Sequence, residues 1–227
     1  MTSFVPPVAS QRFLLETLAD IDGIARLPGF EAATPDLVDA VLAEASRLAA
    51  DVLAPLNRIG DEVGARLDNG VVRLPDGFAD AFRALADGGW IGLNAAPDHG
   101  GQGLPFALAC AVSEQFMSAN MAFAVNPMLT SGAIEALQAH ATDAQKKMWL
   151  EPLVAGRWSG TMNLTEPQAG SDVGSLRTRA TPAGDGSWKI KGQKIFISWG
   201  EHDLAENIVH LVLARTPGAP EGTRGIS

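Results

Sequence analysis

Residues 162–175 read MNLTEPQAGSDVGS, and this stretch decides how the rest of the chain is interpreted. The run that ends at Thr165 predicts a strand, and Gly170 and Gly174 predict a loop after it. Glycines in such a loop let backbone amides approach a ligand closely, while Thr165 and Ser171 add hydroxyl groups. An ordinary strand-turn-strand explains these residues about as well on physical grounds alone.

A second stretch, residues 194–200, reads KIFISWG. Phe196 and Ser198 are two positions apart, so in a strand they would share one face. Such a face can stack on a planar ring and hydrogen-bond to its edge. Taken alone the signal is weak, because aromatic residues in strands usually belong to the core.

Together the two stretches resemble the acyl-CoA dehydrogenase family. Residues 164–172 match its middle-domain signature of an aliphatic residue, Ser or Thr, Glu, two variable positions, a small residue, Gly, Ser or Thr, and Asp. Asn163 departs from the small residue usually found before that signature. Residues 188–198 match the family pattern W-x-[I/L]-x-G-x-K-x-[F/W]-I-[S/T]. Residues 96–103 are similar to its glycine-rich Pro-x-x-x-Gly-Gly-x-Gly loop, and residues 4–18 are similar to the N-terminal extension of larger bacterial members.

The resemblance implies an enzyme that binds FAD between a helical N-terminal domain, a β-barrel middle domain and a helical C-terminal domain. Residues 162–165 would run along the pyrimidine edge of the flavin. Ser171 would lie near the cofactor phosphates and the acyl-CoA substrate, Phe196 would pack against the isoalloxazine ring, and Ser198 would hydrogen-bond near N5. The implied cofactor-binding residues are Met162, Asn163, Leu164, Thr165, Gly170, Ser171, Phe196, Ile197 and Ser198.

The reaction implied by the resemblance introduces an α,β double bond into an acyl-CoA thioester. A carboxylate removes the α-proton while a hydride leaves the β-carbon for flavin N5, and the family carries that carboxylate in its C-terminal domain. Glu166 belongs to the signature and is not the base, so no catalytic residue is assigned and the base is expected beyond Ser227. We therefore expect this chain to be inactive alone. The implied partners are an acyl-CoA, an electron-transfer flavoprotein or similar acceptor, and further copies of the full-length chain in a homo-oligomer.

Two alternatives stay open at this point. An acyl-CoA oxidase shares the scaffold but reoxidises its flavin with oxygen, so oxygen consumption without another acceptor would distinguish it. A non-catalytic partner or fragment that lacks the base by design belongs to a different class of protein.

The charge distribution suggests a domain boundary near residue 160. Residues 1–160 hold 19 acidic and 10 basic residues, whereas residues 161–227 hold seven of each. We expect an α+β multidomain fold: an extension over 1–34, an all-α helical domain over 35–158, and an incomplete β-barrel middle domain over 159–227. The C-terminal helical domain of the family is expected to be absent from this chain.

Local signals place the elements. Thr34 and Pro35 supply a cap and a first helical residue, and Pro55 is expected to kink or end the helix that follows. Further helices are expected from Phe78 to a stop at Gly88, over 105–118, from Pro127 onward, and over 142–153, where Thr142 and Gln145 have capping-box spacing. Strands are expected over 159–165, 176–181, 188–198 and 208–214, with a hairpin turn at 183–187.

Composition excludes several classes of function. A net charge of −9 argues against nucleic acid as a partner. A single cysteine excludes an internal disulfide framework and a metal site built from cysteines. No segment approaches the ~18 consecutive apolar residues of a membrane span, and the N-terminus lacks the basic start and apolar run of a signal peptide. These features favour a cytoplasmic protein without a membrane span.

Overall fold

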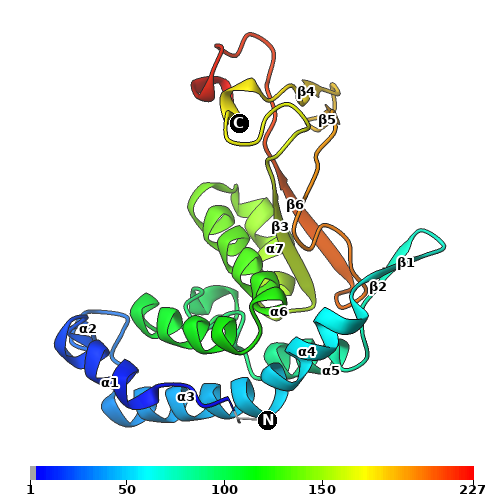
Figure 1. The fold of residues 1–227 in the computed structure, drawn as a ribbon. Helices are drawn as coiled ribbons and strands as arrows, with labels where there is room; N and C mark the ends of the chain where they lie inside the picture. Colours follow the sequence, from blue (N-terminus) through cyan, green and yellow to red (C-terminus); the bar gives the residue numbers. More distant parts are fainter. Residues whose placement is uncertain (1–3) are drawn as a thin grey trace.

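The computed structural model describes residues 4–227, so residues 1–3 of the expected extension lie outside the described part. The helices gather into one body, from which β3 and β6 rise to a loop-rich end that carries β4, β5 and the C-terminus (Figure 1). The extension contains two helices that the sequence analysis did not predict, α1 (Val8–Thr17) and α2 (Ile21–Ile24).

The first long helical segment is interrupted just before Pro55. α3 (Pro35–Leu48) begins as expected, with the Leu37 amide donating to the hydroxyl of Thr34. A π-helical stretch (Ala49–Leu53) follows, and α4 (Ala54–Val63) continues from it with Pro55 in its first turn. The Ala54 N–H donates to the Ala49 carbonyl, so the helix continues through this point with the wider π-helical pairing that often marks a kink. The interruption predicted at Pro55 therefore takes the form of a π-helical stretch ahead of the proline.

Two predicted helices are confirmed and a hairpin was missed. α5 (Phe78–Asp87) ends at Gly88, and α7 (Asp143–Val154) begins with the expected capping box. Between α4 and α5 lies an antiparallel hairpin of β1 (Arg66–Asp68) and β2 (Val71–Arg73). Asn69 and Gly70 form its turn, a strong hairpin signal that was overlooked.

The longest helix, α6 (Phe106–His140), is two helices joined at a break. Asn120 has φ −157° and ψ 87°, its Nδ2 donates to the Leu53 carbonyl, and its Oδ1 accepts from the Phe123 amide. The last contact is an N-cap hydrogen bond, so the second half begins directly after Asn120. The prediction of a helix starting near Pro127 is therefore wrong, because Pro127 lies within this second half.

The helical core is apolar and close-packed around α6. Phe123 lies at its centre, with its ring edge-on to Phe78 at 5.5 Å between centroids, and Phe116 makes a similar contact with Trp90 at 5.6 Å. These residues are buried with apolar side chains from α3, α5 and α7. The largest fully buried apolar residues of these helices are Leu42, Leu85, Leu108, Phe123, Ile134, Leu150 and Leu153.

The described strands form three two-stranded sheets. β3 (Trp158–Asn163) pairs in parallel with β6 (Asn207–Val212), and β4 (Arg179–Pro182) pairs antiparallel with β5 (Trp188–Lys191). The hairpin expected at 183–187 is confirmed. The strands around it are shorter than predicted or shifted, and the incomplete barrel stays a prediction.

The largest correction concerns residues 188–198, which were expected to form one strand. β5 ends at Lys191, and residues 192–198 form no strand. Phe196 has φ +54° and Trp199 φ +55°, which an extended strand cannot accommodate. The argument that Phe196 and Ser198 share a strand face is therefore wrong. A left-handed turn presents them instead.

β3 crosses the second half of α6 at close range, and Gly160 makes this approach possible. A Cβ at Gly160 would lie 2.5 Å from the Cβ of Ala133, and the Gly160 amide donates to the Thr130 hydroxyl at 3.1 Å. The close contact between α6 and β3 is therefore possible only because residue 160 is a glycine and carries no side chain.

We expect Gly160→Ala to lower the free energy of unfolding by about 1–3 kcal/mol, the usual cost of overpacking. Gly132→Ala is the matched control on the facing helix, because its added Cβ meets no atom within 4 Å. The control is expected to raise stability by about 0.5–1 kcal/mol through helix propensity. Urea denaturation of both variants measures the difference, and an equal response would contradict the proposed close packing.

Candidate functional site

Glu166 organises the loop that follows β3. Its carboxylate is 3 % exposed and lies 2.9 Å from the ammonium of Lys194, itself 10 % exposed. The carboxylate also accepts hydrogen bonds from the Arg177 amide at 2.6 Å and the Thr178 amide at 3.0 Å. Lys194 donates in addition to the Leu164 carbonyl at 2.9 Å. One buried ion pair therefore joins three separate segments of the chain.

The electrostatics of this pair favour the charged state. Burial by itself raises the pKa of the Glu166 carboxyl, but the hydrogen bonds that it accepts outweigh burial and hold that pKa well below its ordinary value. Glu166 is thus a fixed anion at neutral pH, which makes it an anchor and unsuited to act as a base. The sequence analysis did not assign Lys194 to the site, because its partner Glu166 lies 28 positions earlier in the chain.

The turn beside this anchor exposes an aromatic ring. Phe196 is 89 % exposed although its backbone is held in the left-handed region at φ +54°. That conformation costs free energy for a non-glycine residue, so it persists only when contacts with neighbouring residues hold the backbone in place. The fixed neighbours are Lys194, in the ion pair, and Ile195, whose amide donates to the Thr165 carbonyl at 3.0 Å. These contacts bring residues 162–165 alongside residues 194–198.

Backbone donors without partners lie on the two segments that the Ile195–Thr165 hydrogen bond joins. Within residues 4–227, the amides of Leu164, Thr165 and Ser198 donate to no protein acceptor. Met162, on β3, is 43 % exposed. An exposed aromatic face next to unused N–H groups suits a large planar ring system with acceptor atoms along its edge. The residues present therefore fit the isoalloxazine ring of a flavin.

The Ser171 loop is a separate part of the candidate site. Gly170 has no heavy atom within 4 Å of where a Cβ would lie, so this part of the loop is open. Further along, Arg215 holds the loop by donating to the Gly174 carbonyl at 2.5 Å and the Leu176 carbonyl at 2.9 Å. Among the described residues, no hydrogen bond joins Ser171 to the turn at Phe196.

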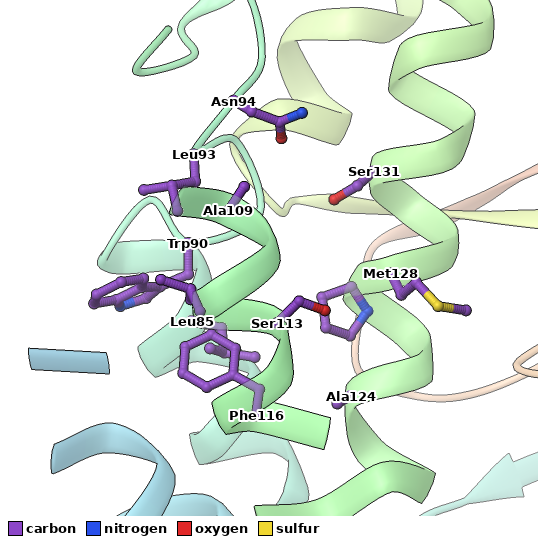
Figure 2. A pocket seen from close by; sticks show the side chains of 12 residues that line it. Leu85, Trp90, Leu93, Asn94, Ala109, Ser113, Phe116, Ala124, Met128 and Ser131 are labelled. Atoms are coloured by element: carbon purple, nitrogen blue, oxygen red, sulfur yellow. The ribbon is translucent and has the colours of Figure 1, made fainter. Parts of the chain in front are cut away.

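An apolar pocket lies between the two halves of α6 and residues 90–94. Its volume is about 60 Å³. In Figure 2, side chains from both halves of the broken helix surround the opening, and the hydroxyls of Ser113 and Ser131 are its main polar groups besides Asn94. The remaining lining residues are Leu85, Trp90, Leu93, Ala109, Val112, Phe116, Ala124, Pro127 and Met128.

Comparison with known proteins places this architecture in a family. The model for the N-terminal domain of acyl-CoA dehydrogenases matches residues 38–157, and the model for their middle domain matches residues 161–227. This chain belongs to the acyl-CoA dehydrogenase family. The resemblance drawn from residues 164–172 and 188–198 is thereby confirmed.

Curated relatives of this chain extend well beyond it. It is 49 % identical over 225 residues to 3-methylmercaptopropionyl-CoA dehydrogenase of Ruegeria pomeroyi, covering 99 % of this chain and 38 % of that protein. It is 38 % identical to a broad-specificity linear acyl-CoA dehydrogenase of Mycobacterium tuberculosis, covering 100 % of this chain and 37 % of that protein. The chain therefore spans less than two fifths of the length of these relatives.

Solved structures of the family share the fold. Butyryl-CoA dehydrogenase of Megasphaera elsdenii matches with a TM-score of 0.67 and 26 % identity, over 85 % of this chain and 46 % of that one. An acyl-CoA dehydrogenase of Bacillus anthracis, solved in complex with FAD, matches in fold with a TM-score of 0.67 and 20 % identity, over 83 % of this chain and 31 % of that one. FAD is the cofactor of the family. None of the described helices is both long enough and apolar enough to cross a bilayer.

Proposed function

We propose that this chain forms the flavin-binding part of an FAD-dependent dehydrogenase that oxidises acyl-CoA thioesters. The observation that carries the proposal is the Phe196 ring, 89 % exposed on a left-handed backbone, in a segment tied to residues 164 and 165, whose amides have no acceptor among the described residues. The membership of the family supports the same reading, since FAD is the family cofactor.

The residues that would hold the cofactor fall into two groups. Residues 162–165 and 196–198 would contact the isoalloxazine ring, with Phe196 against its face and Ser198 as a hydrogen-bond donor near N5. Gly170 and Ser171 would contact the phosphates, and Ser171 would also approach the acyl-CoA. Glu166 and Lys194 fix the first group in place and touch neither ligand.

When bound, FAD supplies the acceptor for the hydride that leaves the β-carbon, while a carboxylate takes the α-proton and an α,β double bond forms. The residues of this chain bind the flavin, orient it and exclude water from one of its faces. Glu166 takes no part in the proton transfer, because its carboxylate is committed to Lys194 and two backbone amides.

The pocket between the halves of α6 is proposed to receive the acyl group. It is lined mainly by apolar side chains, as a hydrocarbon chain requires. Two relatives act, by their names, on short acyl groups: 3-methylmercaptopropionyl-CoA and butyryl-CoA.

Reconstitution with FAD tests the cofactor part of this proposal. A protein of the relatives' length is expected to retain the flavin on gel filtration and to show an absorbance band near ~450 nm, because protein groups supply the binding contacts and the flavin supplies the colour. FMN and riboflavin are the controls: FMN lacks the adenosine monophosphate portion of FAD, and riboflavin lacks both phosphates as well as the adenosine, and the Ser171 loop is proposed to contact the phosphates. A protein that retains none of the three would refute the proposal.

The electron acceptor is proposed to be an electron-transfer flavoprotein or a similar protein, and the full-length chain is proposed to form homo-oligomers.

Anaerobic addition of an acyl-CoA to a flavin-loaded protein of the relatives' length should bleach the flavin band. Recovery with a protein acceptor but not with oxygen would identify a dehydrogenase, and rapid recovery with oxygen would identify an oxidase.

A further inference from the structure

A buried histidine joins the turn of the candidate flavin site to the helical part. His202 is 4 % exposed. Its Nε2 lies 2.8 Å from the Ser159 hydroxyl of β3 and 3.3 Å from the side-chain amide of Asn126 in α6. Its Nδ1 accepts a hydrogen bond from the Leu204 amide at 3.2 Å. One imidazole ring therefore connects a helix, a strand and the segment that leads into β6.

These contacts determine the tautomer. A backbone N–H can only donate, so Nδ1 must carry a lone pair toward Leu204 and the proton must sit on Nε2. Nε2–H then donates to Ser159. The Oδ1 atom of Asn126 is buried with no partner among the described residues, and an amide oriented with that oxygen toward the ring adds an acceptor for Nε2–H.

The ring also supports the turn directly. Trp199, which follows Ser198, packs edge-on against His202 with 5.4 Å between ring centroids, and against Phe123 at 6.3 Å. The Trp199 indole N–H donates to the Ala122 carbonyl at 3.0 Å. Because Trp199 has φ +55°, this packing is what fixes a strained backbone position beside Ser198.

We propose that His202, as the neutral Nε2–H tautomer, is a positioning residue that clamps the Phe196–Trp199 turn onto α6 and β3 and so holds the flavin-contacting residues in place. The inference rests on the proposed flavin site for its functional meaning. A protonated ring would carry N–H groups on both nitrogens, so Nδ1–H would face the Leu204 N–H without an acceptor and the clamp would open.

The charged neighbours set the sign of the pH dependence. Burial lowers the pKa of His202, while the adjacent Glu201 and Asp203 raise it, and burial is the larger effect. Asp203 is partly engaged elsewhere, since it lies 3.5 Å from Arg73 of β2. α6 and β3 present only the neutral groups named above. The neutral ring is therefore favoured in the folded protein. His202 takes up a proton, and the clamp opens, only as the pH falls below its folded-state pKa, which lies below the ordinary histidine value of about 6.5.

Nitrogen NMR of the histidine-labelled full chain tests the clamp without any flavin. At pH 7.5 we expect His202 to show a protonated Nε2 and an unprotonated Nδ1. As the pH falls, the indole N–H of Trp199 should lose its protection from hydrogen exchange together with the protonation of His202. In His202→Gln that pH dependence should vanish, whereas His140→Gln, at the exposed end of α6, should behave like the unmodified protein. A proton on Nδ1, or an unchanged Trp199 response in His202→Gln, would overturn the proposal.

FAD affinity over the same pH range tests the positioning role. We expect affinity to fall at least about fivefold on protonation, the effect of one unpaired buried donor, and to be independent of pH in His202→Gln. If Trp199 responds to pH but FAD affinity does not, His202 fixes the turn without positioning the site and the proposal fails. If FAD does not bind at any pH, the proposed function fails, and the NMR result still decides whether the clamp exists.

Discussion

Lys194→Met is expected to lower the free energy of unfolding by about 3–5 kcal/mol, because removing one partner of a buried ion pair leaves the other charge uncompensated. The Glu166 carboxylate would keep its two backbone amides but lose the ammonium at 2.9 Å, in surroundings where it is 3 % exposed. The turn at Phe196 depends on the same lysine, so FAD affinity should fall with stability.

Lys191→Met is the matched control, since this lysine is exposed on β5 and forms no ion pair among the described residues. Guanidinium denaturation of both variants gives the comparison. Equal midpoints for Lys194→Met and Lys191→Met would show that the pair contributes nothing to stability.

The same pair predicts a direction for acid unfolding. The pKa of Glu166 is lower in the folded than in the unfolded protein, so its contribution to stability is present above the unfolded-state value of about 4.3 and is lost as the pH falls toward the folded-state pKa. In Lys194→Met the folded-state pKa should rise toward the unfolded-state value, because the carboxylate accepts one charged hydrogen bond fewer. The loss of stability in acid should therefore be smaller and should be complete at a higher pH.

Phe196→Ala is expected to weaken FAD binding by about 10- to 150-fold, which corresponds to the roughly 1.5–3 kcal/mol gained by burying a phenylalanine side chain. Stability should not change, because the ring is 89 % exposed and contributes little to the core. A loss of affinity without a loss of stability separates this ring from ordinary core aromatics.

Trp188→Ala is the control for Phe196→Ala. Trp188 is a half-exposed aromatic on β5, outside the proposed flavin contacts, and its removal should leave FAD affinity unchanged. Fluorescence titration with FAD measures both variants. Equal losses in the two would mean that Phe196 has no specific role.

The sequence predicted best where a local signal coincides with a local structure. The Thr142 capping box and the stop at Gly88 are such cases, because each depends on residues a few positions apart. The helix expected over 105–118 ends close to the break at Asn120, but the start of the next helix was wrongly expected at Pro127. The position of the break depends on a tertiary contact, because the Asn120 side chain donates to the Leu53 carbonyl. Residues 192–198 have the alternating sequence pattern of a strand. The strand nevertheless ends at Lys191, because the Lys194 side chain turns inward to Glu166.

The candidate site was predicted by resemblance to a family. The structure adds the residues that hold the site in place. The spacing of Phe196 and Ser198 predicted a shared strand face, and that geometry is wrong, since a left-handed turn presents both residues. Their contact with a flavin stays a prediction. Lys194 and His202 were not predicted as site-supporting residues, because their partners Glu166, Ser159 and Asn126 are distant in sequence.

The parallel pairing of β3 with β6 also has a kinetic consequence. Parallel strands need a long crossover, and here residues 164–206 form it, a segment that contains the β4–β5 hairpin and most of the proposed flavin contacts. Contacts between residues so distant in sequence form slowly, because the entropy of closing the loop is lost before the pairing is gained. The helical body, with its largely local contacts, should therefore fold first, and the flavin face should mature only when β6 docks. A folding protein would then pass through a stage in which the helices are native and the cofactor cannot yet bind.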